Sequence, residues 1–64
     1  MPGYRLYYLG LDGRIVAFEA FEARTDVEAL MQANQFATIA RSVSWELWTG
    51  GRRVHKVASP TPAT

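Results

Sequence analysis

The sequence predicts an α+β fold of ββαββ order, with a four-stranded sheet built from two hairpins and one helix packed on one face. Two segments show the strand–turn–strand pattern, residues 4–18 around a Gly-Leu-Asp-Gly turn and residues 43–57 around a Thr-Gly-Gly turn. Between them, Thr25-Asp26-Val27-Glu28 has the capping-box pattern that begins a helix. A capped helix flanked by two hairpins gives the predicted element order.

The register of the first hairpin follows from its turn. A three-residue loop closed by Gly13 in a left-handed conformation pairs Gly10 with Arg14. A shift by one residue would bring Glu19 opposite Leu6 or Tyr4 among the core side chains, so we expect the unshifted register. The expected pairs are Tyr4–Ala20, Leu6–Phe18 and Tyr8–Val16 on the core face, with Arg5–Glu19 and Tyr7–Ala17 on the other face.

The helix is expected from Asp26 to about Ala40, with Thr25 as its cap. Acidic residues in its first turn suit the positive end of the helix dipole, and Arg41 suits the negative end. The expected buried stripe comprises Val27, Ala29, Leu30, Ala33, Phe36, Ala37 and Ala40. Its alanines allow a close approach to the sheet, whereas Met31 and Ile39 are expected to be half exposed.

In the second hairpin, a two-residue Gly50-Gly51 turn pairs Thr49 with Arg52. The expected pairs are Leu47–Val54 and Trp45–Lys56 on the core face, with Trp48–Arg53 and Glu46–His55 on the other face, and Val43 is expected in the core.

Residues 59–64 contain two prolines and no apolar pattern. We therefore expect one domain over residues 1–58 and a disordered tail over 59–64.

Two strand orders are compatible with this layout. Either the first and last strands are central and parallel, as in a β-grasp sheet, or the first and third strands are antiparallel neighbours. In element order the chain resembles the small immunoglobulin-binding β-grasp domains. It also resembles short bacterial proteins of ββαββ layout through Tyr4–Tyr7, Asp12–Ile15 and Glu46–Arg52. That second resemblance implies the layout and no assigned activity.

Composition excludes several kinds of site. The chain has 64 residues, no cysteine and one histidine, so neither a disulfide nor a zinc site can form from its own side chains. Both glycine turns are followed by strands, whereas a phosphate-binding loop precedes a helix. We therefore expect no metal, no cofactor and no small-molecule ligand. No signal-peptide pattern or membrane-length apolar run is visible, which predicts a soluble cytoplasmic protein without membrane contact.

One pair of side chains invites a catalytic interpretation. Glu46 opposite His55 could orient an imidazole as a general base. No activated nucleophile accompanies the pair, and cross-strand pairs of this kind commonly stabilise sheets. We therefore expect a non-enzymatic protein.

The sheet face away from the helix carries the main functional prediction. The expected register leaves a large apolar area on that face, which comprises Tyr7, Leu9, Ile15, Ala17, Trp48 and Val57 beside the polar residues Arg5, Glu19, Glu46, Arg53 and His55. Exposed apolar area on so small a protein is typical of an interface. The sequence thus predicts a protein-interaction module, self-associating as a homodimer or binding another protein. Its predicted contact residues are Tyr7, Leu9, Ile15, Trp48 and, at the rim, Arg53.

Single-stranded nucleic acid is the alternative partner. Residues 1–32 contain three basic and five acidic residues, whereas residues 33–64 contain four basic and one acidic. The second hairpin is thus the basic end, and basic groups beside an aromatic ring can bind phosphates and stack on bases. The residues for this alternative are Trp48, Arg52, Arg53, His55 and Lys56. A pI of about 8.2 and acidic residues on the same face favour protein association instead.

Overall fold

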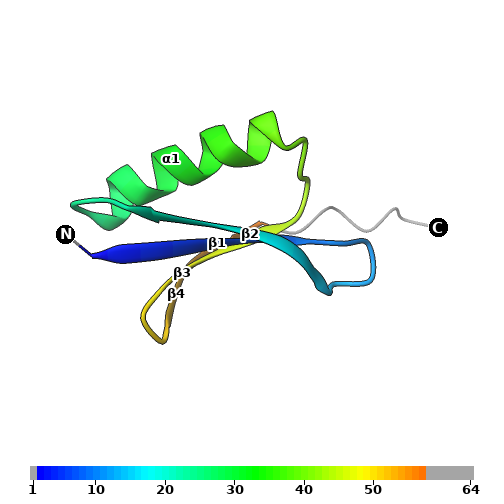
Figure 1. The fold of residues 1–64 in the computed structure, drawn as a ribbon, viewed down its shortest axis with the longest axis horizontal. Helices are drawn as coiled ribbons and strands as arrows, with labels where there is room; N and C mark the ends of the chain where they lie inside the picture. Colours follow the sequence, from blue (N-terminus) through cyan, green and yellow to red (C-terminus); the bar gives the residue numbers. More distant parts are fainter. Residues whose placement is uncertain (1, 58–64) are drawn as a thin grey trace.

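The computed structural model describes residues 2–57 and confirms the ββαββ order and the α+β class (Figure 1). Its elements are β1 (Gly3–Leu9), β2 (Ile15–Glu22), α1 (Asp26–Ile39), β3 (Trp45–Thr49) and β4 (Arg52–Val57). The tail predicted over 59–64 and the domain boundary at 58 lie outside the described residues and stay predictions.

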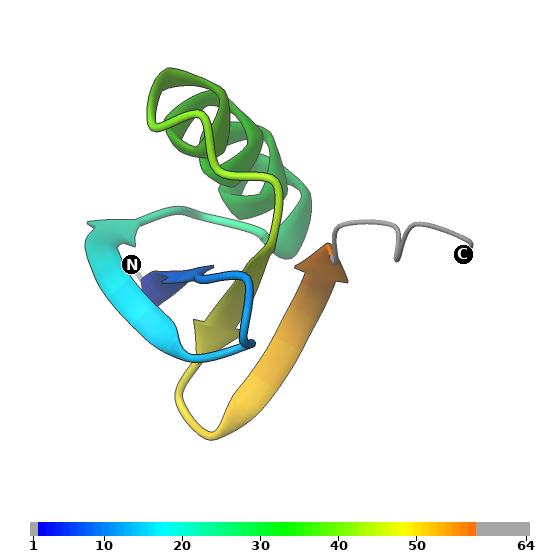
Figure 2. The same ribbon diagram turned by 90° about the vertical axis from the view of Figure 1, so that its right-hand side faces the viewer.

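The four strands form one sheet in the order β2-β1-β3-β4, and each neighbouring pair is antiparallel. Of the two strand orders compatible with the sequence, the antiparallel one is therefore confirmed, because β1 lies beside β3 and not beside β4. The helical connection carries the chain across the sheet and returns it alongside β1 (Figure 2). As a result β1 and β3 are central, while β2 and β4 are the edges.

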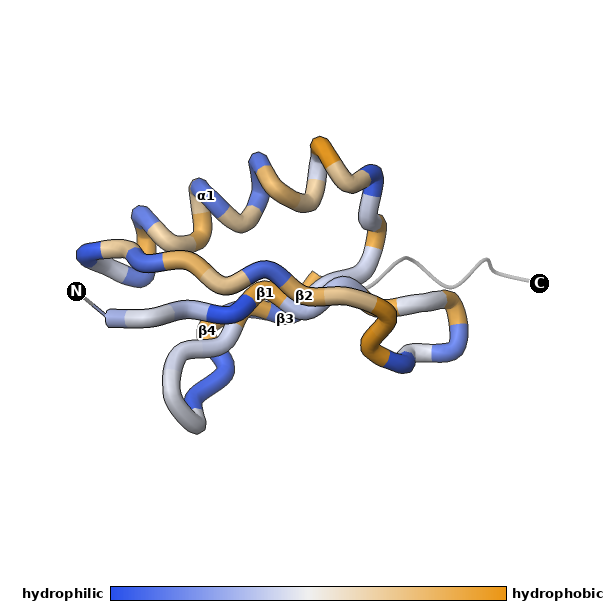
Figure 3. The backbone as a smooth tube through the Cα atoms, in the orientation of Figure 1, coloured by the Kyte–Doolittle hydropathy of each residue, from blue (hydrophilic) through white to orange (hydrophobic). Residues whose placement is uncertain are grey.

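The core lies between α1 and the two central strands, on one face of the sheet (Figures 1 and 2). Leu6 of β1 and Leu47 of β3 are opposite each other and fully buried. The other buried side chains are Tyr4, Tyr8, Ala23, Ala29, Ala33, Ala37 and Trp45. Polar positions recur along the outer side of α1 (Figure 3). The helix thus meets the sheet through alanines spaced four residues apart.

Aromatic packing fastens the edge strand β2 to the helix near the N-terminal end of β1. The Phe21 ring lies 5.4 Å from the Phe36 ring and 5.9 Å from the Tyr4 ring. Such ring pairs add to the stability that burial alone supplies. Phe36, which belongs to the predicted stripe, therefore anchors the helix on the sheet.

The helix begins at the predicted cap and ends in a left-handed residue. Thr25 is extended and its Oγ1 accepts a hydrogen bond from the Glu28 amide at 3.1 Å. The return bond differs from a standard capping box, because Glu28 Oε1 accepts from the amide of Arg24 at 3.4 Å. At the other end Arg41 has φ 55°, its amide donates to Thr38 O, and the next amide donates to Ala37 O. These two bonds form a Schellman motif.

Each hairpin keeps its predicted turn but carries one extra residue just beyond it. In the first, Gly10 N donates to Arg14 O at 2.8 Å and Gly13 has φ 82°, as predicted. In the second, Thr49 pairs with Arg52 and Trp48 with Arg53, also as predicted. The register then shifts by one residue between Tyr8 and Leu9 and between Leu47 and Trp48. Val16 and Val54 are the extra residues, so both edge strands contain a β-bulge.

The bulges make several predicted pairs wrong. The observed pairs are Tyr4–Phe21, Leu6–Glu19, Tyr8–Ala17, Arg5–Ala20 and Tyr7–Phe18 in the first hairpin, with Leu47–His55, Glu46–Lys56 and Trp45–Val57 in the second. Ala17, Glu19, His55 and Val57 therefore lie on the helix side, and Phe18 lies on the opposite face. Glu19 is tolerated on the helix side because its strand is an edge and its side chain stays exposed.

Some predicted core residues are exposed. The exposed fractions are 71% for Val27, 61% for Val43 and 67% for Val16, and Ala40 is exposed as well. Met31 and Ile39 are 62% and 81% exposed, more than predicted. The helix buries a narrow alanine stripe, so positions at the margins of the predicted stripe remain in solvent. Among residues 2–57, no helix combines the length and apolar character needed to cross a membrane.

Replacing Arg41 with glycine tests the helix terminus. Left-handed backbone costs an L-residue roughly 1–2 kcal/mol, and the greater freedom of glycine in the unfolded chain offsets part of the gain. We expect Arg41→Gly to raise the free energy of unfolding by about 0.5–1 kcal/mol in urea titrations. Arg41→Ala is the matched control, because it keeps the Cβ and should give no gain. Equal stabilisation by both variants would contradict this explanation.

Candidate interaction surface

The face of the sheet opposite α1 is formed by alternate residues of each strand. Tyr4, Leu6 and Tyr8 are buried under the helix, so the residues between them point to the other side. Cross-strand pairing then places Phe18 and Glu46 on either side of Tyr7. We call this surface the open face; its members are Arg5, Tyr7, Leu9, Ile15, Phe18, Ala20, Glu22, Glu46, Trp48, Arg53 and Lys56.

An aromatic cluster occupies the β1–β2 side of the open face. The rings of Tyr7 and Phe18 lie 6.2 Å apart, and the guanidinium carbon of Arg5 lies 5.9 Å from the centre of the Phe18 ring. This is a cation–π arrangement at a ring that is 56% exposed by residue area. The cluster therefore presents both an apolar surface and a positive charge.

Glu46 organises the β3–β4 side of the same face. Its Oε1 accepts a hydrogen bond from the Trp48 indole Nε1 at 2.9 Å, and its Oε2 lies 3.9 Å from Lys56 Nζ. The indole nitrogen is thereby satisfied by a neighbour on its own strand. The hydrogen bond fixes the orientation of the Trp48 ring, which remains half-buried on the surface.

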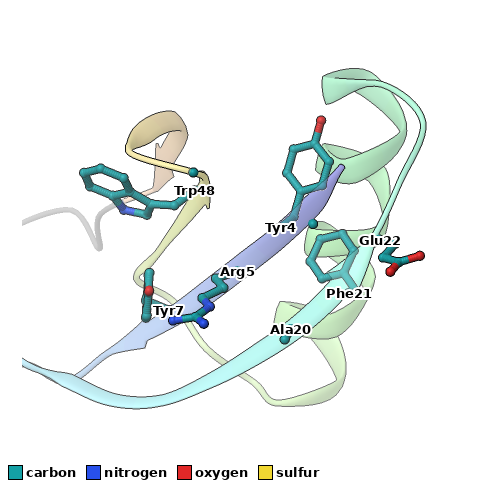
Figure 4. Close-up of a pocket in the computed structure, with 9 residues that line it drawn as sticks. Tyr4, Arg5, Tyr7, Ala20, Phe21, Glu22 and Trp48 are labelled. Carbon is teal, nitrogen blue, oxygen red and sulfur yellow. The ribbon is translucent and has the colours of Figure 1, made fainter. Parts of the chain in front are cut away.

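A shallow hollow of about 610 Å³ lies between these two groups, at the N-terminal end of β1. Arg5, Tyr7 and Trp48 line it from the central strands, and Ala20 and Glu22 line it from β2. Figure 4 shows Arg5, Tyr7 and Trp48 among the residues that line it, with Tyr4 and Phe21 nearer the helix. The hollow has aromatic and charged walls, a mixture that suits a side chain from another molecule.

Arg52 lies on the helix side and links three elements. Its two terminal nitrogens donate to Asp26 Oδ2 and Oδ1 at 3.1 and 3.2 Å, and Tyr4 Oη donates to Asp26 Oδ1 at 2.7 Å. Asp26 is the first residue of α1, Tyr4 belongs to β1 and Arg52 begins β4. The bidentate geometry is the strong form of an arginine–carboxylate contact.

These contacts change the proton affinities of the three groups. The hydrogen bonds from Arg52 and then Tyr4 hold the pKa of Asp26 below its ordinary value of 3.8. The hydrogen bond to the same carboxylate raises the pKa of Tyr4 above 10.0 and also raises the pKa of the Arg52 guanidinium. At neutral pH the cluster therefore contains a carboxylate, a neutral phenol and a guanidinium.

All five predicted interface residues lie on the open face. Tyr7 and Trp48 are half-buried near its centre, and Arg53 is opposite Trp48 at the β4 edge. Leu9 is half-buried and Ile15 is 59% exposed, where the face ends at the first turn. The sequence predicts Phe18 in the core and does not indicate that Arg5 contacts its ring. The bulge at Val16 places Phe18 on the open face and brings it beside Arg5, and no local pattern in the sequence indicates the bulge.

The residues predicted for nucleic acid are divided between the two sides of the sheet. Trp48, Arg53 and Lys56 share the open face, whereas Arg52 contacts Asp26 on the helix side. The His55 ring lies 5.7 Å from that of Trp45, also on the helix side. The predicted Glu46–His55 pair is therefore wrong, because Lys56 takes the place opposite Glu46. Within residues 2–57, no three metal-ligating side chains lie together.

Comparison with protein-family models, with curated proteins and with solved structures finds no match to this chain. The resemblance to short bacterial proteins of the same layout stays an interpretation of the sequence.

The Asp26 cluster predicts a loss of stability in acid. Folding lowers the pKa of Asp26. The carboxylate therefore stabilises the folded protein at pH values above its unfolded-state pKa, and this stabilisation is lost as the pH falls through its folded-state pKa. Unfolding titrations from pH 6 to pH 2 should show this loss in the wild type. Asp26→Asn and Arg52→Gln should each reduce the loss of stability between pH 6 and pH 2. The variant with both substitutions should show the same loss as Asp26→Asn alone. Additive effects of the two substitutions would contradict the pairing.

Proposed function

We propose that this protein is a non-enzymatic interaction module that self-associates by packing its open face against that of a second copy. The observation that carries the proposal is the unequal covering of the sheet. One face is covered by α1, while the other presents Tyr7, Phe18 and Trp48 across three adjacent strands with part of each ring in solvent. Aromatic residues of this kind are enriched in protein interfaces.

The charges of the open face support a second copy as the partner. Arg5, Arg53 and Lys56 are accompanied by Glu22 and Glu46 on the same surface. A two-fold interface brings each patch against itself, so a patch with both signs can pair its own charges. Burial of the rings would also strengthen a small domain, since a chain of 64 residues has a limited core of its own.

Single-stranded nucleic acid is the second candidate, and one observation favours it. The central strands present Tyr7 and Trp48 on an uncovered sheet face beside Arg5, the arrangement that stacking and phosphate binding use. Against it, Arg52 and His55 are engaged on the helix side, and Glu46 and Glu22 contribute negative charge to the face. Protein association therefore remains the first proposal, and the cytoplasmic location expected from the sequence stays part of it.

Trp48→Thr tests the open face. Threonine suits a strand but removes the ring, so the variant should keep the far-ultraviolet circular dichroism of the folded protein. The dissociation constant of face-to-face association should rise at least about thirtyfold. The measurement is sedimentation equilibrium across a dilution series. Met31→Thr is the matched control, because it removes a comparably exposed apolar side chain from the outer side of α1.

Unchanged association in Trp48→Thr would contradict packing through this face. The nucleic-acid candidate is tested separately, by anisotropy of a labelled oligothymidine in increasing salt. Binding that weakens steeply with salt and is lost in an Arg53→Gln, Lys56→Gln variant would replace the first proposal with the second.

A further inference from the structure

The two edges of the sheet differ sharply in chemistry. Edge β4 consists mostly of basic residues, Arg52, Arg53, His55 and Lys56, which discourage pairing with another strand. Edge β2 is longer, with eight residues, and six of them are apolar: Ile15, Val16, Ala17, Phe18, Ala20 and Phe21. Seven of the eight residues of β2 are exposed, with Phe21 the exception. A long, apolar edge strand is a template for pairing with another strand.

The hydrogen-bond pattern shows which backbone groups of β2 are available. Ala23 N donates to Pro2 O on the β1 side, and Leu9 N donates to Ser44 O on the β3 side. Because antiparallel partners alternate, even residues of β1 bond to β2 and odd residues bond to β3. Phe18, Ala20 and Glu22 lie opposite the odd residues Tyr7, Arg5 and Gly3. Their N–H and C=O groups therefore point away from β1, outward from the free edge of the sheet.

Only a few registers allow two copies of β2 to pair about a two-fold axis. A centre at Phe18 would run the pairing into the bulge at Val16, where the alternation is broken. A centre at Glu19 would place two carboxylates directly opposite each other, which is unfavourable. A centre at Ala20 uses residues 18–22, which all lie in the regular part of β2. It pairs Ala20 with Ala20 and Phe18 with Glu22 of the second copy.

This register also joins complementary charges. Glu22 of one copy comes opposite Phe18 of the other. In each copy the guanidinium carbon of Arg5 lies 5.9 Å from the centre of the Phe18 ring. The two-fold axis repeats the contact, so each copy contributes one glutamate and one arginine. Glu19 then faces Phe21 of the second copy and not the other Glu19. The two Ala20 side chains at the centre point out of the plane of the sheet, so they do not separate the paired backbones.

We propose that a second copy of this chain pairs antiparallel with β2, centred on Ala20, to form a continuous eight-stranded sheet. The axis is perpendicular to the sheet, so both helices lie on one side and both open faces on the other. The pairing goes beyond the proposed function and does not depend on it. If both contacts form, four chains close into two such sheets packed face to face, with the helices outside.

Ala20→Pro tests the backbone pairing. Proline removes an N–H that points away from β1, a position where an edge strand tolerates it. Both copies lose a central hydrogen bond, so the dissociation constant of edge pairing should rise at least about thirtyfold in sedimentation equilibrium. Ala20→Thr, which keeps the N–H and suits a strand, is the matched control and should associate like the wild type. Equal association of Ala20→Pro and wild type would overturn the proposal.

A charge exchange tests the register even if Ala20→Pro fails to fold. Glu22→Arg and Arg5→Glu should each weaken association about tenfold, because each places like charges across both symmetric contacts. An equal mixture of the two variants should recover wild-type association, since every contact in the mixed dimer joins opposite charges. Failure of the mixture to associate more strongly than either variant alone would overturn the Ala20 register.

The two interfaces give distinguishable results. Edge pairing alone predicts a wild-type dimer that Trp48→Thr leaves intact and Ala20→Pro disrupts. Open-face packing alone predicts the reverse and would overturn the edge proposal. Both together predict a wild-type tetramer that either substitution reduces to a dimer. A wild-type monomer at all concentrations up to about 1 mM, far above the dissociation constants of specific dimers, would overturn both.

Discussion

The fit of one short helix on the two central strands is the constraint on which the rest of the structure depends. α1 is 14 residues long and meets the sheet through Ala29, Ala33 and Ala37. A helix about 10 Å wide spans roughly two strands spaced about 4.8 Å apart. It therefore covers Leu6 and Leu47 on β1 and β3 and leaves most residues of both edge strands exposed. The open face and the exposed edge β2 are consequences of this geometry.

The Tyr4–Asp26–Arg52 cluster shows how a small fold uses polar contacts where the core ends. The helix begins beside the turn of the second hairpin, and the contacts connect α1, β1 and β4. Arg52 appears in the sequence as part of a run of basic residues available to a ligand. In the folded protein its guanidinium is instead paired with a carboxylate that also receives the Tyr4 hydroxyl. The basic character of the second hairpin is thus divided between a structural contact and the open face.

The uncovered surfaces have different chemistries, which favours different contacts for each. The open face mixes aromatic rings with both signs of charge, as a polar interface does. Edge β2 presents apolar side chains and unpaired backbone groups, whereas β4 presents positive charge. In the associations that we propose, covering either of the first two surfaces would add buried area to a small protein, and the positive charge of β4 would disfavour pairing along that edge.

Local patterns in the sequence by themselves determined the element order, the Thr25 cap, both turns and the alternation that buries the core residues of β1 and β3. They also placed Tyr7, Leu9, Ile15, Trp48 and Arg53 on one face. These features depend on neighbours within a few residues, or on a strand period of two, which a sequence displays directly.

Only the tertiary structure decided the strand order, the partner of Arg52 and the registers of β2 and β4. A single extra residue in each edge strand moved Phe18 onto the open face and moved His55 off it. Such shifts are settled by pairing and packing between residues far apart in the chain, because an edge strand that the helix does not cover can expose either of its faces at little cost.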